Sequence, residues 1–473
     1  MWLLPPPLRP GSPAMSHPIP LTVSSQIRVL RNRFAQRDGL PFADVLPESS
    51  IERAIQEHGG GWRDEVFTPV VTLWAFLTQV ICPVGCCRLT VARVMAWLVA
   101  RGQRPCGPGT GGYCKARVRL PEGALSQLAR EAGRALDAQS PELWLWKGRR
   151  VQIADGTTVS MPDTPANQKE YPHPGSQAQG IGFPQIRLVA LFSLACGAIL
   201  DVALGPSRGK QSGETALLRQ IAGSVGSGTV LLADRYFGGW FDMALWRERG
   251  VEVVTRIHQK RATDFRRGRH LGREDHVVRW PKRQRPEWMD RETYLRLPDE
   301  LEIREVRVRV SQRGFRTKVL VVATTLTDPA IKAADLADLY RQRWQIEVDL
   351  RSVKVTLGMD VLRCKTPALV RKEVWAHLLA YNLIRTAMAQ VAQASERRPR
   401  ELSVAGTVQA LAAFAEVLDT DAGYQAFVRV VLAYPVGDRP DRFEPRARKR
   451  RPKPYPPLTV PRAQARKRLG RSV

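Results

Sequence analysis

The sequence predicts an α/β fold: a mixed sheet with helices packed on its faces, preceded by a helical region and followed by a basic tail. The first observation is a change of texture after residue 147, where short runs rich in Val, Ile and Leu begin, bounded by Gly, Pro or Asp as buried strands are. The second is the helical pattern between those runs, notably at 213–223 and 240–249. The third is the charge, since 73 Lys and Arg against 45 Asp and Glu give +28 at neutral pH.

Length and composition limit the classes of protein. A chain of 473 residues suggests about three domains. Hydrophobic residues make up 44% and charged residues 25%, which excludes a wholly disordered or collagen-like chain. Apolar runs of about 18 residues or more are missing, so no transmembrane helix is expected. The charge of +28 predicts a polyanionic partner, with nucleic acid first.

The N-terminal third divides into a leader and a helical region. Residues 1–24 open with a Pro-rich stretch that lacks a long apolar core, so we expect a disordered leader, with Met15 as an alternative start. From 25 to 147 the pattern is helical, with Ser50 placed to cap a helix. The stretch 68–81 is apolar almost all round and predicts a buried helix.

Two further helices are predicted on either side of a Gly/Pro-rich break, over 88–101 and 113–138. The second contributes Lys115, Arg117 and Arg119 to a basic face. Helices with basic faces around a tight break suit a DNA-binding domain. A plain helical bundle with solvated charges explains the same pattern equally well.

The α/β part is predicted over 148–390. A basic, Pro-containing stretch with a β-like alternation interrupts the strand–helix pattern. We interpret 259–327 as a mostly β insertion, whose last apolar stretch is again a strand of the central sheet. Long helical stretches follow, and after them a helical C-terminal segment at 391–437 and a basic, Pro-rich tail at 438–473. We expect the tail to be disordered. It either binds the DNA backbone or only keeps the protein soluble. The strands are expected at 151–155, 186–195, 229–234, 251–257 and 318–326, and the later helices at 331–357, 368–391 and 400–434.

The cysteines predict neither a disulfide framework nor a zinc site. Their number is odd, no C-x2-C pair occurs, and the seven histidines are scattered. A reducing, cytoplasmic setting is the expectation that fits this use of cysteine.

Two acids stand at the ends of predicted strands. Asp155 ends VQIAD and is followed by Gly156, and Asp234 ends TVLLAD and is followed by Arg235. In open α/β sheets, ligands bind beyond the carboxyl ends of strands, where an acid faces the substrate. One such Asp is a weak signal, because Asp is common at strand ends and turns. Two make a functional role as good an explanation as a structural one.

A third acid lies in the helix predicted over 331–357. Tyr340, Arg343, Glu347 and Lys354 recur there at offsets of 3, 7 and 14 from the tyrosine. At about 100° per residue these offsets return to nearly the same azimuth, so the four side chains share one stripe. Glu347 would then stand at the margin of the buried face. A solvated face with i,i+4 ion pairs is the alternative, and charge spacing alone favours it.

Three carboxylates on separate elements of a strongly basic protein suggest divalent metal binding. Oxygen ligands suit Mg²⁺ or Mn²⁺, which take their remaining ligands from water and phosphate. Two such ions about 3.5–4 Å apart activate a water or a 3′-hydroxyl and stabilise the leaving oxygen of a phosphodiester. This chemistry explains why acids would be placed against a polyanion that they would otherwise repel.

The pattern Y-x2-R-x3-E-x6-K resembles, at every spacing, the signature of bacterial insertion-sequence transposases of the fourth insertion-sequence family, which carry a DDE triad. Asp155 in ADGT and Asp234 in ADRYF look like the first two acids of that triad, and Glu347 like the third. In that family a mostly β insertion within a ribonuclease H-like fold fills the gap before the glutamate, as the residues at 259–327 do here. The resemblance covers about 25–460.

The resemblance implies a role for each matched residue. Asp155, Asp234 and Glu347 would hold two divalent cations, Mg²⁺ or Mn²⁺. Tyr340 would contact transposon-end DNA next to the cleaved phosphate, together with Arg343 and Lys354.

Three other residues have two explanations each. Arg235 either touches DNA or forms a structural ion pair. Trp280 and Trp288 are candidates for stacking on an extruded base, although ordinary packing is the more common role of a tryptophan.

The implied activity is that of a DNA transposase. It would bind the terminal inverted repeats of its element in double-stranded DNA, hydrolyse the strands at each end and join the 3′-hydroxyls to target DNA. A homodimer would hold the two DNA ends together. The protein would be cytoplasmic, associated with the nucleoid when it is bound to DNA, and no membrane partner is expected. Two alternatives are a ribonuclease H-like nuclease without strand transfer and an inactive, transposase-derived DNA-binding regulator.

Overall fold

The computed structural model of the chain describes residues 46–59, 62, 66–82, 84–100, 102–178, 180–309, 319–414, 417–418, 420–436 and 457–468. The predicted leader at 1–24 lies outside these residues, as does most of the predicted tail. In the described part of that tail, Arg462–Arg468 forms the short helix α16.

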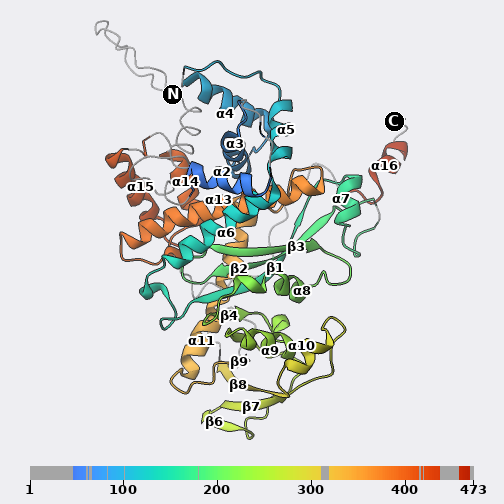
Figure 1. Cartoon of the computed structure of the whole chain (residues 1–473), viewed down its shortest axis with the longest axis vertical. Coiled ribbons are helices and arrows are strands. Elements are labelled where there is room, and N and C mark those ends of the chain that lie inside the picture. Colours follow the sequence, from blue (N-terminus) through green and yellow to red (C-terminus); the bar gives the residue numbers. More distant parts are fainter. Residues whose placement is uncertain are drawn as a thin grey trace, which may run out of the picture.

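One mixed sheet forms the centre of the molecule and confirms the predicted α/β class (Figure 1). Within the described residues it has nine strands in the order β3-β2-β1-β4-β5-β9-β8-β7-β6. The pairs β1–β4 and β4–β5 are parallel, and the other neighbours are antiparallel. The strands are β1 (Val151–Ser160), β2 (Gln185–Ser193), β3 (Ile199–Pro206), β4 (Val230–Ala233), β5 (Glu252–Arg256), β6 (Arg269–Gly272), β7 (Asp275–Pro281), β8 (Glu300–Arg309) and β9 (Val319–Thr324).

Helices cover the sheet. The α-helices are α2 (Glu48–Glu57), α3 (Pro69–Ile81), α4 (Cys87–Ala100), α5 (Gly111–Arg119), α6 (Glu122–Ala138), α7 (Pro165–Glu170), α8 (Glu214–Gln220), α9 (Trp240–Glu248), α10 (Arg291–Arg296), α11 (Ala333–Gln342), α12 (Gln345–Arg351), α13 (Pro367–Gln393), α14 (Val404–Ala413) and α15 (Asp421–Ala433). Short turns are η1 (Glu142–Trp144), η2 (Ala222–Ser224), η3 (Arg235–Phe237), η5 (Pro399–Glu401) and the π-helical η4 (Ser352–Thr356). None of the described helices combines the length and the apolar character needed to cross a membrane.

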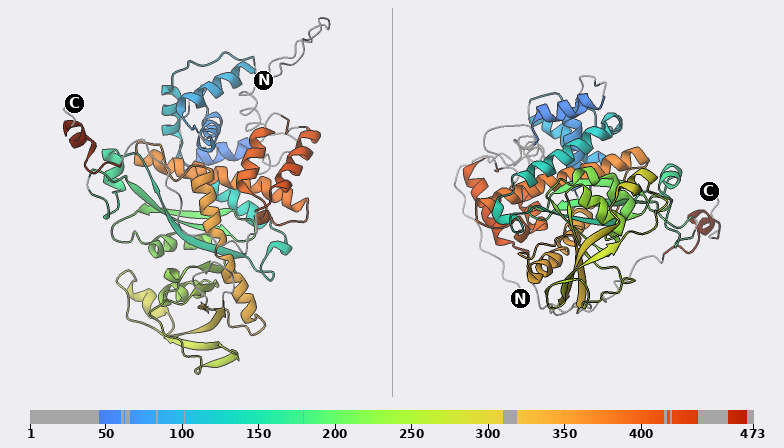
Figure 2. Two further views of the ribbon diagram at one scale, coloured as in Figure 1. Left: turned by 180° about the vertical axis from the view of Figure 1, so that it is seen from behind. Right: turned by 60° about the horizontal axis from the view of Figure 1, so that its bottom comes forward.

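The blue N-terminal helices and the yellow strands β6–β8 lie at opposite ends of the molecule (Figure 2). The buried helix predicted at 68–81 is confirmed by α3, whose side chains are buried on nearly every side. Ser50 does not cap a helix, because α2 begins at Glu48 after Pro47, and Ser50 lies inside it.

Helices α6 and α13 join the N-terminal helices to the sheet. A side chain on Gly133 of α6 would overlap the carbonyl of Ile199 in β3, so a glycine is needed for this close approach. The fully buried Asn382 of α13 fixes the contact, because its amide donates 2.8 Å hydrogen bonds to the carbonyls of Ala129 and Ile199. The sheet therefore has a firm support on this side.

Strand β1 is longer than predicted, and Asp155 lies within it instead of at its end. Only the parallel partner stops there, since Ala154 pairs with Ala233 at the end of β4 while β1 continues beside β2 to Ser160. A sequence run shows where apolar residues stop, but it does not show that one partner strand continues. The pattern also gave no sign of β3, which follows β2 after a short turn.

The residues between β5 and β9 extend the same sheet. Strand β9 pairs with β5 on one side and with β8 on the other, so β6–β8 continue the sheet outward. A buried ion pair reinforces this extension, with Arg304 Nη2 of β8 lying 2.6 Å from Asp275 Oδ2 of β7. Arg304 also donates to the carbonyl of Ile331 at 2.7 Å, which fixes the chain just before α11.

The prediction of one continuous helix over 331–357 is wrong. It consists of α11, α12 and the π-helical η4 in succession. Between α11 and α12 the backbone changes to i→i−3 hydrogen bonds, as from Arg343 N to the Tyr340 carbonyl at 3.2 Å. Azimuths computed for a straight helix therefore do not hold for Glu347 and Lys354, and their positions must be taken from their contacts.

Candidate active site

Parallel pairing brings the first two acids together. Ala154 and Ala233 are register partners, and the next residue on each chain is Asp155 and Asp234. Neighbouring strands are about 4.8 Å apart, so the two aspartates lie side by side where the β1–β4 pairing ends. Asp155 accepts a hydrogen bond from Gly156 N at 2.8 Å, and Asp234 accepts one from Arg235 N at 2.7 Å.

Arg343 links the third acid to the first. Its Nη2 lies 3.1 Å from Glu347 Oε1, and its Nη1 lies 3.7 Å from Asp155 Oδ2. The helix α12, which carries Glu347, packs against β1, the strand that carries Asp155. The structure thus brings the three predicted acids into one neighbourhood, with a guanidinium between two of them.

The pKa of Asp155 is shifted by its surroundings. Burial is the main cause and, together with the charges of Glu214 and Asp234, it raises the pKa of the carboxyl from 3.8 to about 6, against the lowering effect of the Gly156 N–H and of Arg343. A carboxylate held in this way is costly to ionise, and a cation at the site would favour its charged form.

Glu214 is a fourth acid at this site that the sequence analysis did not single out. It opens α8, which packs against β1, β2 and β3. The sequence contained only a weak sign of this acid, because a glutamate in the first turn of a helix is common and is explained by the helix dipole alone.

Tyr340 and Lys354 also converge on the site. Burial raises the pKa of the Tyr340 hydroxyl to about 12, and Arg343, Asp234 and Arg256 are the charged groups near it. Lys354 Nζ lies 3.0 Å from Thr157 Oγ1 and donates to the Thr158 carbonyl at 2.9 Å. The lysine therefore lies along β1, two to three residues beyond Asp155.

A buried charge network, which sequence reasoning also missed, holds α12 in place. Asp349 has no exposed surface; it forms an ion pair with Arg385 of α13 and another with Arg400 Nη1 at 2.8 Å. Arg400 also donates to the Ser193 carbonyl at the end of β2 at 2.7 Å. Because Asp349 is two residues from Glu347, this network fixes the helix that carries the third acid.

The two tryptophans differ in their surroundings. Trp280 is 4% exposed, and its indole nitrogen donates to Glu305 Oε1 at 2.8 Å, so it is a packing residue. Trp288 is 38% exposed, and the Arg219 guanidinium lies over its ring at 3.5 Å. Arg235 Nη1 donates to Gln259 Oε1 at 3.0 Å, which is a hydrogen bond to the start of the insertion and not an ion pair.

One residue of the predicted N-terminal basic face points inward. Arg117 is 7% exposed, and its guanidinium lies over the Tyr113 ring at 4.9 Å and 3.4 Å from Cys87 Sγ. Lys115 and Arg119 are exposed as predicted. All seven cysteines are free.

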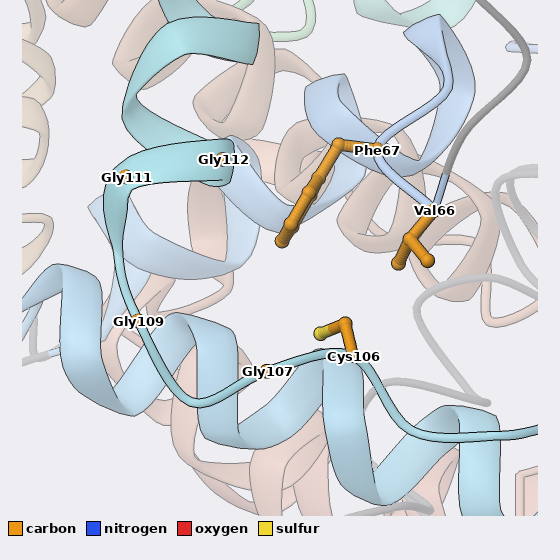
Figure 3. Close-up of a pocket in the computed structure, with 7 residues that line it drawn as sticks. All are labelled: Val66, Phe67, Cys106, Gly107, Gly109, Gly111 and Gly112. Atoms are coloured by element: carbon orange, nitrogen blue, oxygen red, sulfur yellow. The ribbon is translucent and has the colours of Figure 1, made fainter.

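The N-terminal region also contains an open hollow of about 530 Å³ beside a glycine-rich segment. Val66 and Phe67 lie on one side of this hollow and Cys106 lies across from them, at the start of the segment that carries Gly107, Gly109, Gly111 and Gly112 (Figure 3). Among the described residues, its lining includes no charged side chain and none of the predicted acids. It therefore has no part in the chemistry of the carboxylates.

The acids fit a divalent cation in their chemistry, since each offers the hard oxygen ligands that Mg²⁺ and Mn²⁺ prefer. The side-chain positions are not those of a formed metal site: within the described residues, no three Asp, Glu, His or Cys side chains are close enough to hold an ion. Arg343 stands between Asp155 and Glu347 instead.

Comparison with known proteins identifies the family to which the chain belongs. The family model described as "Transposase DDE domain" matches residues 146–383, which include all three acids. The chain belongs to this family of DDE transposases. The InsG transposase of insertion sequence element IS4 from Escherichia coli K12 is 28% identical over 287 residues, 57% of this chain and 61% of that protein. The predicted membership of the fourth insertion-sequence family is thereby confirmed.

Two other matches are more limited. The putative transposase InsL of element IS186A from Escherichia coli K12 is 40% identical over 65 residues, 14% of this chain and 18% of that protein. A piggyBac transposase synaptic complex with hairpin DNA aligns with 86% of this chain and 81% of its own at a TM-score of 0.39 and 9% identity, too distant a likeness to carry an argument. The chain matches less than two thirds of the length of these curated relatives.

Proposed function

We propose that this DDE transposase cuts DNA at the ends of an insertion sequence and joins the free 3′-hydroxyls to target DNA. One observation carries the proposal: the register of β1 and β4 sets Asp155 beside Asp234, and Arg343 ties Glu347 to Asp155. A charge of +28 indicates a polyanionic partner, and grouped carboxylates would repel that partner unless bound cations offset their charge.

Asp155, Asp234 and Glu347 would hold two Mg²⁺ or Mn²⁺ ions. When bound, such ions supply Lewis-acid activation of a water or a 3′-hydroxyl and charge stabilisation of the leaving oxygen. The buried backing of Asp155 by the sheet keeps that carboxylate in place, and the Asp349 network keeps Glu347 in place. The catalytic domain is proposed to be ribonuclease H-like, which the strand order β3-β2-β1-β4-β5 supports.

The basic groups around the acids would bind the DNA backbone. Arg343 already neutralises two of the carboxylates, and once cations do so, a phosphate is the anion its guanidinium can meet. Tyr340, which lies near Arg343, and Lys354, which lies along β1 beyond Asp155, would contact the same DNA strand, with Arg235 beyond Asp234. Two such sites, one per DNA end, call for a homodimer in the complex that joins the ends.

The test uses purified full-length protein, DNA carrying the element's own ends, and Mg²⁺ or Mn²⁺. Cleavage followed by joining to a plasmid supports the proposal, and cleavage without joining indicates a nuclease instead. Binding without cleavage under either metal indicates a regulator. Asp155→Asn, Asp234→Asn and Glu347→Gln should each retain DNA binding and lose cleavage, whereas Glu142→Gln, outside the site, should retain both.

A further inference from the structure

Two thiols of the N-terminal helices face each other. Cys87 is the first residue of α4, and Cys114 is the fourth residue of α5. The Cys114 thiol donates a hydrogen bond to Cys87 Sγ, and the two sulfur atoms are 4.0 Å apart. Both residues are partly exposed, so a small molecule can reach them. The bond in a disulfide is about 2.05 Å long, so the sulfurs need to approach each other by only about 2 Å to be joined.

A buried guanidinium lies beside both sulfurs. Arg117 Nη2 is 3.4 Å from Cys87 Sγ and 3.7 Å from Cys114 Sγ. Burial raises the pKa of the Cys87 thiol, whereas the charge of Arg117 lowers it, so the cation partly offsets the cost of forming a thiolate there. The same cation disfavours a metal ion between the sulfurs, because the two positive charges would repel each other. The pair is therefore suited to sulfur chemistry and not to metal binding.

We infer that Cys87 and Cys114 form a site of reversible oxidation, at which a small disulfide such as oxidised glutathione converts the two thiols into a disulfide bond. The bond would join α4 to α5 and close a loop that contains α4 and the Gly/Pro-rich break at 102–110. Both cysteines are free as the protein stands, so the structure is the reduced form of the pair. Oxidation fixes the two helices to each other and reduction releases them, so the pair responds to the redox state of its surroundings.

Oxidation proceeds by two thiol–disulfide exchanges. The thiolate of one cysteine attacks a sulfur of oxidised glutathione, whose S–S bond breaks and releases one glutathione thiolate. The thiolate of the other cysteine then attacks the protein sulfur of this mixed disulfide, which forms the Cys87–Cys114 bond and releases the second glutathione thiolate. The two protons that leave the cysteines are taken up by the two glutathione thiolates. The protein thus loses two electrons, and one molecule of oxidised glutathione is reduced to two thiols.

The test exposes the folded, full-length protein to oxidised glutathione at increasing ratios to reduced glutathione. The remaining thiols are blocked with iodoacetamide, and linked peptides are identified by mass spectrometry after digestion. The parent should contain the peptide of Cys87 joined to that of Cys114, and dithiothreitol should remove the link. Cys87→Ser and Cys114→Ser should each lose it. Cys86→Ser and Cys106→Ser are the matched controls, because Cys86 is the exposed neighbour of Cys87 and Cys106 is a partly exposed thiol in the break; both should form the link as the parent does.

Three results would overturn the inference. The first is the absence of the linked peptides from the folded parent at every glutathione ratio. The second is an undiminished yield of the link in Cys87→Ser or Cys114→Ser, which would mean that other cysteines form the bond. The third comes from oxidation of the parent in urea, where the share of this link among all linked peptides should fall. A share that does not fall would show that the folded arrangement does not direct the pairing.

Discussion

Replacement of Asp155 by Asn should stabilise the metal-free protein while removing its activity. Burial raises the pKa of Asp155 from 3.8 to about 6, so above pH 6 the fold holds a carboxylate that it would bind better protonated. A tenfold change in a proton equilibrium corresponds to about 1.4 kcal/mol, so the ionised carboxylate costs the fold about 3 kcal/mol. Asn removes this charge and keeps an oxygen that can accept from Gly156 N.

The sign of the pH dependence follows from the raised pKa. Between about pH 4 and pH 6 the folded state binds more protons than the unfolded state, so stability falls as the pH rises through this window. The advantage of Asp155→Asn should be about 3 kcal/mol at pH 7.5 and about half of that at pH 5. It should disappear below about pH 3, where Asp155 is neutral in both the folded and the unfolded protein.

The measurement is urea unfolding of both proteins at pH 5 and pH 7.5 in the presence of a chelator. Asp299→Asn serves as the control, because the Asp299 side chain is 99% exposed and its replacement should change stability by less than about 0.5 kcal/mol. Adding Mg²⁺ should stabilise the parent and leave the Asn variant unchanged. An Asn variant less stable than the parent, or equally stabilised at both pH values, would refute the reasoning.

Three further predictions concern the supports of the site and its DNA contacts. Asp349→Ala leaves Arg385 and Arg400 buried without their carboxylate and should cost about 3–5 kcal/mol in urea unfolding; a loss below 1 kcal/mol would contradict the anchoring role. Trp280→Ala should cost about 3–5 kcal/mol, because Trp280 is buried. Trp288→Ala should cost only about 1 kcal/mol, since Trp288 is 38% exposed and is stacked by Arg219, and equal losses in the two variants would show that the assignment is wrong. Truncation after Val436 should lower the salt dependence of binding to non-specific DNA, measured as the slope of log K against log salt, because the removed segment carries a net charge of +10; an unchanged slope would show that the tail does not touch DNA.

The sequence was most informative where a residue pattern reflects burial. The apolar runs located β2, β4, β5 and β9, and the all-round apolar stretch located α3, because most of the residues in these elements are buried, in β9 those of its second half. The three acids were found for a different reason, since the spacing of a known signature and two strand-end motifs pointed to them. Their grouping in the structure depends on the β1–β4 register, which no single run encodes.

What the sequence did not predict depends on tertiary contacts. The interruption between α11 and α12 and the π-turn that follows place Lys354 on β1, and no periodicity indicates either irregularity. Asp349 resembled an ordinary helix-surface acid until Arg385 and Arg400, from distant segments, were seen around it. Cys87 and Cys114 are 27 residues apart, and only the packing of α4 on α5 brings their sulfur atoms together.

The most direct test of the account is a strand-transfer assay with the purified protein, DNA carrying the element's ends, a supercoiled target plasmid and Mg²⁺. The account predicts joined products for the parent and none for Glu347→Gln, with DNA binding retained in both. Joined products of undiminished yield from Glu347→Gln, or their formation by the parent in the presence of excess chelator, would contradict the claim that these acids and their divalent ions perform the chemistry.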